Sequence, residues 1–229
     1  MILDIRLRTA ADMVPSGARL ADIGSDHAYL PIALCLENKI EAALASDINE
    51  GPVEAAVANI HKNGLGSRIV AVRADGLDKT RDFAPDCITI LGMGGELIVS
   101  ILDKAKWVKD ENITLVLQPM THPEILAKYL AENGFGVVDE KIVRDGTRDD
   151  RIYRILSAKF DGKERTLTDG EALIGRLNID RGDEITAAYI EKNIRVLETR
   201  IAGKARSGDG AEKEKRLVDE LKSYLERNF

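Results

Sequence analysis

The sequence has few aromatic residues, few cysteines and no long hydrophobic run. Aromatic residues make up 4% of the chain, so we expect a core of Ile, Leu, Val and Ala. The two cysteines, Cys35 and Cys87, stand in separate apolar segments without the spacing of metal ligands, which predicts buried free thiols in a reducing compartment and no metal site. No run approaches the roughly 18 apolar residues of a membrane span, and no signal peptide opens the chain. We therefore expect a cytoplasmic protein without a membrane segment, as a monomer or a weak dimer.

What is present is a charged chain with a substantial apolar fraction. Of its 229 residues, 44% are hydrophobic, which is enough for one full domain and a smaller appendage. The formal net charge is −6. That charge argues against a wholly basic surface for nucleic acid but permits a local basic patch.

Strand-like and helix-like segments alternate through residues 1–160. Short apolar runs that end in glycine, proline or Asp-Gly predict five strands, at residues 19–24, 41–48, 67–77, 86–95 and 113–119. Helical patterns between them cover residues 28–36, 51–65 and 122–136. Two further runs, 137–145 and 151–159, have no helix between them and predict an antiparallel pair with a turn at 145–150. This order predicts a mainly parallel sheet with helices on both faces.

The segment 165–229 has a different pattern, which predicts a second, helical domain after a first domain at 1–160. Apolar residues recur at steps of three and four, at Ile190, Ile194, Leu197 and Ile201 and again at Val218, Leu221 and Leu225. A glycine-containing break at 207–210 separates the two series, so we predict an antiparallel hairpin of two amphipathic helices. Its cations, which suit either RNA phosphates or a solvated helix face, are Lys192, Arg195, Arg200, Lys204 and Arg206.

Polar residues and glycines collect at the ends of the predicted strands. They are Gly24, Asp26, Asp47, Asp75, the glycine-rich segment 92–95, Gln118 and Pro119. Parallel α/β sheets bind ligands beyond the carboxyl ends of their strands, where the strand order reverses. The sequence therefore predicts one binding site built from neighbouring strand ends.

The segment ADIGSDHAYLP, residues 21–31, indicates which ligand that site takes. If Gly24 opened a dinucleotide-binding loop, Asp26 and Tyr29 would occupy the second and third glycine positions. A carboxylate there disfavours a pyrophosphate, which needs close approach of bare backbone. It suits S-adenosylmethionine, which has no phosphate and carries a sulfonium and an ammonium group.

Two further strand ends suit the nucleoside part of that cofactor. Asp47 stands where a carboxylate accepts hydrogen bonds from ribose hydroxyls, and Asp75 with the amide of Gly76 suits the adenine edge. With Asp22 and Gly24, these residues predict a class I methyltransferase cofactor site. Each also has a purely structural explanation, because Asp47 is a suitable helix cap, Asp75 suits a plain turn, and Asp22 is placed to orient the loop.

Four motifs of the chain match a known family: ADIGSDHAYLP, RADGLD, ITILGMGGELI and LVLQP. Through them the whole chain resembles the bacterial tRNA (adenine-22-N1)-methyltransferase family. The resemblance implies a short N-terminal helix, an α/β Rossmann-like class I methyltransferase domain whose mostly parallel seven-stranded sheet has its last strand antiparallel, and a C-terminal helical coiled-coil hairpin. It also implies S-adenosyl-L-methionine as cofactor, tRNA as partner, and methyl transfer to N1 of an adenine in the D-loop region.

The resemblance also assigns roles to individual residues. Asp26 is the candidate catalytic residue, as a proton acceptor or an electrostatic partner of the adenine amino group, although it suits the cofactor ammonium equally well. The GMGG segment either lets the backbone approach a flipped base or begins a helix. The predicted cofactor ligands are Asp22, Gly24, Ser25, His27, Asp47, Ile48, Asp75, Gly76, Gly92 and Met93. The predicted substrate contacts are Arg6, Gly94, Gly95, Gln118 and Pro119.

Two other functions stay open on the sequence alone. The absence of an Asn-Pro-Pro-aromatic loop leaves room for a methyltransferase that acts on a small molecule or a protein. A noncatalytic tRNA-binding protein with a relic cofactor pocket is the second alternative. His27, which stands alone after its loop, fits a structural hydrogen bond better than the role of a catalytic base.

Overall fold

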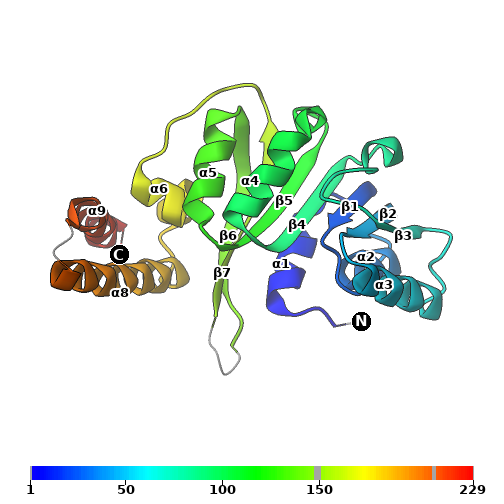
Figure 1. The fold of residues 1–229 in the computed structure, drawn as a ribbon, viewed down its shortest axis with the longest axis horizontal. Coiled ribbons are helices and arrows are strands. Elements are labelled where there is room, and N and C mark those ends of the chain that lie inside the picture. The colour runs from blue at the N-terminus through cyan, green and yellow to red at the C-terminus, as the bar shows by residue number, and fades with distance from the viewer. Residues whose placement is uncertain (1, 147–150, 208–209, 229) are drawn as a thin grey trace. The chain divides into compact units, whose positions relative to one another are not determined.

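The computed structural model describes residues 2–146, 151–207 and 210–228, and Figure 1 traces them. The chain divides into two compact units, Met1–Arg165 and Thr166–Phe229. The predicted turns at 145–150 and 207–210 lie partly outside the described residues. Each unit is described by itself below.

The first unit is built on a seven-stranded sheet with the order β3-β2-β1-β4-β5-β7-β6. The strands are β1 (Ala18–Ile23), β2 (Ile40–Asp47), β3 (Ile69–Arg73), β4 (Cys87–Gly94), β5 (Thr114–Thr121), β6 (Phe135–Arg144) and β7 (Ile152–Phe160). Strands β1 to β5 pair in parallel, whereas β7 is antiparallel to both β5 and β6. The predicted Rossmann-like sheet with an antiparallel last strand is confirmed.

Helices cover both faces of this sheet because residues along each buried strand alternate between two cores. On β1, Leu20 belongs to one core and Ala21 to the other. The first core packs against α1 (Ile5–Met13), α2 (Tyr29–Leu36) and α3 (Glu50–Lys62), and the second against α4 (Gly95–Lys104) and α5 (Pro123–Glu132). Two short 3-10 helices, η1 (Arg81–Phe83) and η2 (Lys106–Val108), complete the unit.

Two predicted strand ends are wrong, and strand pairing explains both. The third strand ends at Arg73, not at residue 77, because its partner β2 ends opposite it at Asp47. The fifth strand continues through Pro119 to Thr121. Since β7 pairs with β5 only as far as Leu117, one side of β5 is free at the proline, which lacks the N–H that a ladder partner would need.

The second unit contains four helices among the described residues: α6 (Asp169–Ile174), α7 (Arg176–Arg181), α8 (Glu184–Ser207) and α9 (Glu212–Asn228). The sequence analysis missed α6 and α7, although the capping box of Thr168 and Glu171 at the start of α6 is a recognisable signal.

The long helices α8 and α9 pack on each other through their apolar faces. Ile190, Ile194 and Leu197 are buried on α8, and Val218, Leu221 and Tyr224 on α9. Ion pairs join Lys204 to Glu214 and Glu198 to Lys222, and this order requires the helices to run antiparallel. Coiled-coil geometry for this pair stays a prediction.

Strands β6 and β7 share a buried ion pair. The Glu140 carboxylate accepts hydrogen bonds from Nε and Nη2 of Arg154 at 3.1 and 2.9 Å, and both side chains are almost completely buried. Removing Glu140 takes away the carboxylate that faces the buried Arg154 guanidinium, and breaking a buried pair in this way is strongly destabilising.

We therefore expect Glu140→Ala to lower the free energy of unfolding by about 3–5 kcal/mol. The matched control is Glu37→Ala, which breaks a solvent-exposed pair with Arg8 in the same unit and should cost at most about 1 kcal/mol. Urea unfolding followed by the fluorescence of Trp107, the single tryptophan of the chain, measures both. Equal losses in the two variants would contradict the expectation.

Candidate cofactor and catalytic site

The reversal of strand order creates a crevice between β1 and β4. From β1 the chain continues to β2 and β3 on one side, and it then crosses to β4 on the other side of β1. Because these strands are parallel, their carboxyl ends share one edge of the sheet, where ligands bind in such folds. The structure thus brings the predicted strand-end residues to one edge.

The loop after β1 is held by a buried carboxylate. Asp22 accepts hydrogen bonds from Oγ of Ser25 at 2.5 Å and from Oγ1 of Thr89, on β4, at 2.6 Å. Burial raises the pKa of Asp22, and the two hydroxyl donors oppose that shift. Since both carboxylate oxygens already have partners, the position of Asp22 favours the loop-orienting role over direct contact with a ligand.

Gly24 is required by its backbone and by its neighbour. Its φ of +71° lies in the left-handed region, and a Cβ atom there would collide with the methyl group of Met93. The next residue, Ser25, donates its backbone N–H to the carbonyl of Ser46 at 2.8 Å. The first loop therefore packs against the end of β2 on one side and against β4 on the other.

The side chain of Asp26, in the same loop, extends into solvent. Its side chain is 71% exposed, and its Oδ1 lies 3.3 Å from Nε2 of His27. The His27 ring stacks on Tyr29, with 5.1 Å between the ring centroids. His27 and Ala28 both have positive φ values, 59° and 55°, and such backbone strain often accompanies functional sites. Asp26 is thus an accessible carboxylate, and Tyr29, which the sequence places at the third glycine position, stacks on its neighbour His27.

Asp47, at the end of β2, has one carboxylate oxygen engaged within the protein. Its Oδ1 accepts a hydrogen bond from the backbone N–H of Asn49 at 2.8 Å, next to the start of α3. Its Oδ2 has no hydrogen-bond partner among the residues that the structure describes. One oxygen therefore supports the helix start, while the other remains available to a ligand hydroxyl.

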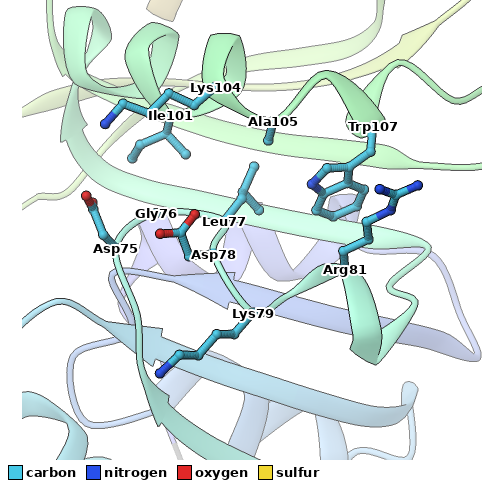
Figure 2. Close-up of a pocket in the computed structure, with 10 residues that line it drawn as sticks. All are labelled: Asp75, Gly76, Leu77, Asp78, Lys79, Arg81, Ile101, Lys104, Ala105 and Trp107. Carbon is cyan, nitrogen blue, oxygen red and sulfur yellow. The ribbon is translucent and has the colours of Figure 1, made fainter.

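Two cavities meet at Asp75. One, of about 340 Å³, is bounded on one side by Ile48 and on the other by Asp75 and Lys79. The second, of about 300 Å³, continues from Asp75 past Gly76 to Trp107, and Figure 2 shows its lining side chains. The structure therefore brings Ile48 and Asp75, predicted at the nucleoside from different strand ends, to one cavity.

The GMGG segment forms a bulge at the end of β4. The β4–β5 register shifts on both sides of Met93, and Gly92 is exposed with φ at +79°. A Cβ atom on Gly94 would come 3.1 Å from Oγ1 of Thr121, and one on Gly95, which is buried, would collide with the carbonyl of His122. Gly94 and Gly95 therefore allow β4 and α4 to pack closely on the end of β5, whereas Gly92 and Met93 face the crevice.

Gln118, Pro119 and Arg6 form a mostly buried group behind the bulge. Gln118 is fully buried and Pro119 is buried as well, so neither offers a surface for direct substrate contact. Arg6 reaches this group from α1, and its Nη1 donates to Oε1 of Gln118 at 3.1 Å. The sequence gives no sign of this contact, since the two residues are far apart in the chain.

Thr89 is the structural residue that the sequence analysis missed. It is a fully buried polar residue within the apolar strand β4, and buried polar groups need hydrogen-bond partners. Its hydroxyl finds one in Asp22, the residue paired with it on the neighbouring strand β1. A polar residue in an otherwise apolar run was the available signal.

Within the described part of the chain, no helix is long and apolar enough to cross a membrane, and no group of three or more His, Cys, Asp or Glu side chains is placed to hold a metal ion. Cys35 and Cys87 are buried free thiols whose pKa values are raised by burial.

Known proteins resemble this chain in sequence and in structure. A family model described as a methyltransferase domain matches residues 3–156. The tRNA (adenine(22)-N(1))-methyltransferase of Bacillus subtilis (strain 168) is 38% identical over 162 residues, which cover 71% of this chain and 67% of that protein.

Two crystal structures are similar over nearly the whole chain. That of the Bacillus subtilis tRNA methyltransferase TrmK has a TM-score of 0.81 at 31% identity and covers 98% of this chain and 96% of its own. That of a Streptococcus pneumoniae protein in complex with S-adenosyl-L-methionine has a TM-score of 0.84 at 30% identity and covers 96% of this chain and 99% of its own. On the domain match and the Bacillus relative together, the chain belongs to the methyltransferase-domain family and, within it, to the tRNA (adenine(22)-N(1))-methyltransferases.

Proposed function

We propose that this protein transfers a methyl group from S-adenosyl-L-methionine to N1 of adenine 22, in the D-loop region of tRNA. The observation that carries the proposal is the set of carboxylates, Asp26, Asp47 and Asp75, at one edge of the sheet in a chain whose relative has that activity. A phosphate-binding loop would need bare backbone amides in place of Asp26.

The residues at the crevice suit S-adenosyl-L-methionine, which when bound supplies the methyl group on a positively charged sulfur. The free oxygen of Asp47 is an acceptor for the ribose hydroxyls, and Asp75 with the amide of Gly76 serves the adenine edge. Ile48, which is exposed beside Asp75 in the same cavity, offers an apolar surface to the ring. The negative charge of these carboxylates favours a cationic ligand.

Asp26 acts on the target base. N1 of adenine already has a lone pair, so attack on the methyl group needs no prior deprotonation. Methylation makes the ring cationic and its exocyclic amine more acidic. The exposed Asp26 carboxylate stabilises that positive charge or accepts the proton, and the base must leave its stack to reach it.

The tRNA backbone needs cations elsewhere, because phosphates bind Lys and Arg. On α8, Lys204 pairs with Glu214 and Arg195 lies 3.8 Å from Glu191, so part of the basic set is balanced by acids. The remaining cations of that set, all exposed, are Lys192, Arg200 and Arg206. We infer a cytoplasmic enzyme that works as a monomer or a weak dimer, which analytical ultracentrifugation with and without tRNA would check.

The function is tested by incubating the protein with labelled S-adenosyl-L-methionine and two tRNA transcripts that differ in having adenine or guanine at position 22. We expect 1-methyladenosine at position 22 of the first transcript and none in the second. Methylation at another position would refute the assignment of the site. Cofactor binding without transfer to any tRNA would favour one of the two alternative functions.

Asp26→Asn should lower kcat by about 10²- to 10⁴-fold, the range typical of a lost general base, with little change in cofactor affinity. The control Asp82→Asn makes the same charge change at an exposed position on η1 and should leave kcat unchanged. Single-turnover methyl transfer and calorimetric titration of the cofactor measure the two effects. A kcat for the Asp26 variant equal to that of the control would remove Asp26 from the chemistry.

Gly24→Ala should weaken cofactor binding at least about tenfold, or roughly 1.4 kcal/mol, because its methyl group collides with Met93 at the crevice. Gly17→Ala is a matched control, since Gly17 has a similar φ of +78° but open space around it. Both variants should lose about 1–2 kcal/mol of stability from the left-handed backbone. Similar cofactor affinities in the two variants would show that the contact with Met93 does not affect cofactor binding.

A further inference from the structure

Both the oxygen and the nitrogen of the Gln118 side-chain amide have partners within the protein. Its Oε1 accepts two hydrogen bonds, from the backbone N–H of Gly92 at 3.0 Å and from Nη1 of Arg6 at 3.1 Å. Its Nε2 donates to the carbonyl of Pro119 at 2.9 Å and lies 3.4 Å from Sδ of Met120. A fully buried amide in an apolar strand is costly unless it is bonded in this way.

These contacts lie where the β4–β5 ladder is irregular. Leu91 pairs with Gln118, Met93 with Pro119, and Gly94 with Thr121. One residue is therefore extra on each strand, Gly92 on β4 and Met120 on β5. The Gln118 amide contacts both extra residues, through its oxygen and its nitrogen, and the two bulges cancel so that the register resumes. Bulges next to active sites re-aim side chains.

The bulge sets the shape of the crevice. Gly92 holds a left-handed conformation, and the following residue, Met93, packs its methyl group on Gly24 of the first loop. A change in the Gly92 backbone therefore moves Met93 relative to the loop that carries Asp26. Displacements of about 1 Å in such sites cost about 10²-fold in rate.

Arg6 fixes which way the amide points. Two N–H donors, one from Arg6 and one from Gly92, converge on the same atom of Gln118, so this atom must be the acceptor oxygen. The Arg6 side chain is only 22% exposed, and its guanidinium lies 6.0 Å from the centre of the Tyr153 ring. The N-terminal helix α1 thus supports the crevice through the hydrogen bond from Arg6 to Gln118.

We propose that Gln118 is a positioning residue for methyl transfer, which holds the Gly92–Met93 bulge in its working shape, and that Arg6 locks the Gln118 amide in place. The inference rests on the proposed function for its kinetic effect. It assigns Arg6 and Gln118 to support of the crevice, in place of the direct substrate contacts expected from the sequence.

The test compares Gln118→Leu, which removes the acceptor at similar size, with Gln118→Glu, which keeps it. We expect Gln118→Leu to lower kcat about 100-fold. Gln118→Glu keeps the acceptor for Gly92 and Arg6 but loses the Nε2 donor to the Pro119 carbonyl, so it should lose clearly less activity than Gln118→Leu. Hydrogen exchange of the Gly92 amide, followed by NMR, should be fast in the Leu variant and protected in the wild type and the Glu variant. The control is Thr114→Val, which alters another buried polar residue of β5. It should neither lower kcat nor speed the exchange of the Gly92 amide.

The coupling to Arg6 is tested in the double variant Arg6→Ala with Gln118→Leu, which should be no slower than Gln118→Leu alone. Multiplying effects would overturn the role given to Arg6. Wild-type kcat in a folded Leu variant, equal losses in the Leu and Glu variants, or unchanged Gly92 exchange in the Leu variant would each overturn the role of Gln118. If the wild-type chain methylated no tRNA, the proposed function would fail, while the exchange of Gly92 would still decide whether Gln118 holds the bulge.

Discussion

The hydrogen bonds accepted by the buried Asp22 carboxylate are the constraint on which the crevice depends. Asp22 ends β1, Ser25 lies in the following loop, and Thr89 belongs to β4, so one carboxyl group joins the two sides of the strand-order reversal. Burial raises the pKa of Asp22, and neutral hydroxyl donors satisfy it without adding positive charge to the crevice. Because each Asp22 oxygen already accepts a hydrogen bond, the less buried carboxylates of Asp26 and Asp47 are more accessible to a ligand.

The glycines around the crevice are best explained by their spatial neighbours. A Cβ atom on Gly24 would displace the Met93 methyl group, and one on Gly92 would come 3.3 Å from Nη1 of Arg6. Gly95 has to be small because the backbone carbonyl of His122 touches it. In a linear sequence these glycines suggest flexible loops near a ligand. In the folded protein they lie where atoms of other elements come close.

This difference explains how much was predictable. The mainly parallel sheet, its antiparallel last strand and the edge that gathers the polar residues follow from local apolar runs, glycine stops and the known topology of parallel sheets, and those predictions hold. The ends of β3 and β5, the partner of Thr89 and the role of Gln118 depend on which strand lies alongside, and no local pattern contains that information. Arg6 is the clearest case, because its partner Gln118 is 112 positions away, whereas its charge and the family resemblance suggested a contact to tRNA.

The placement of charge also constrains how the proposed substrate is approached. Carboxylates such as Asp26, Asp47 and Asp75 favour a cationic donor and a base that becomes cationic during the reaction, but they repel phosphates over roughly a Debye length of about 8–10 Å. An RNA backbone drawn close to these three carboxylates would therefore be disfavoured, whereas Lys79, Arg81 and Lys104, which line the cavity beside Asp75, attract phosphates. A single base extended from its stack separates the reacting ring from its own phosphates. These carboxylates therefore suit a flipped nucleotide better than an adenine that remains in its helix.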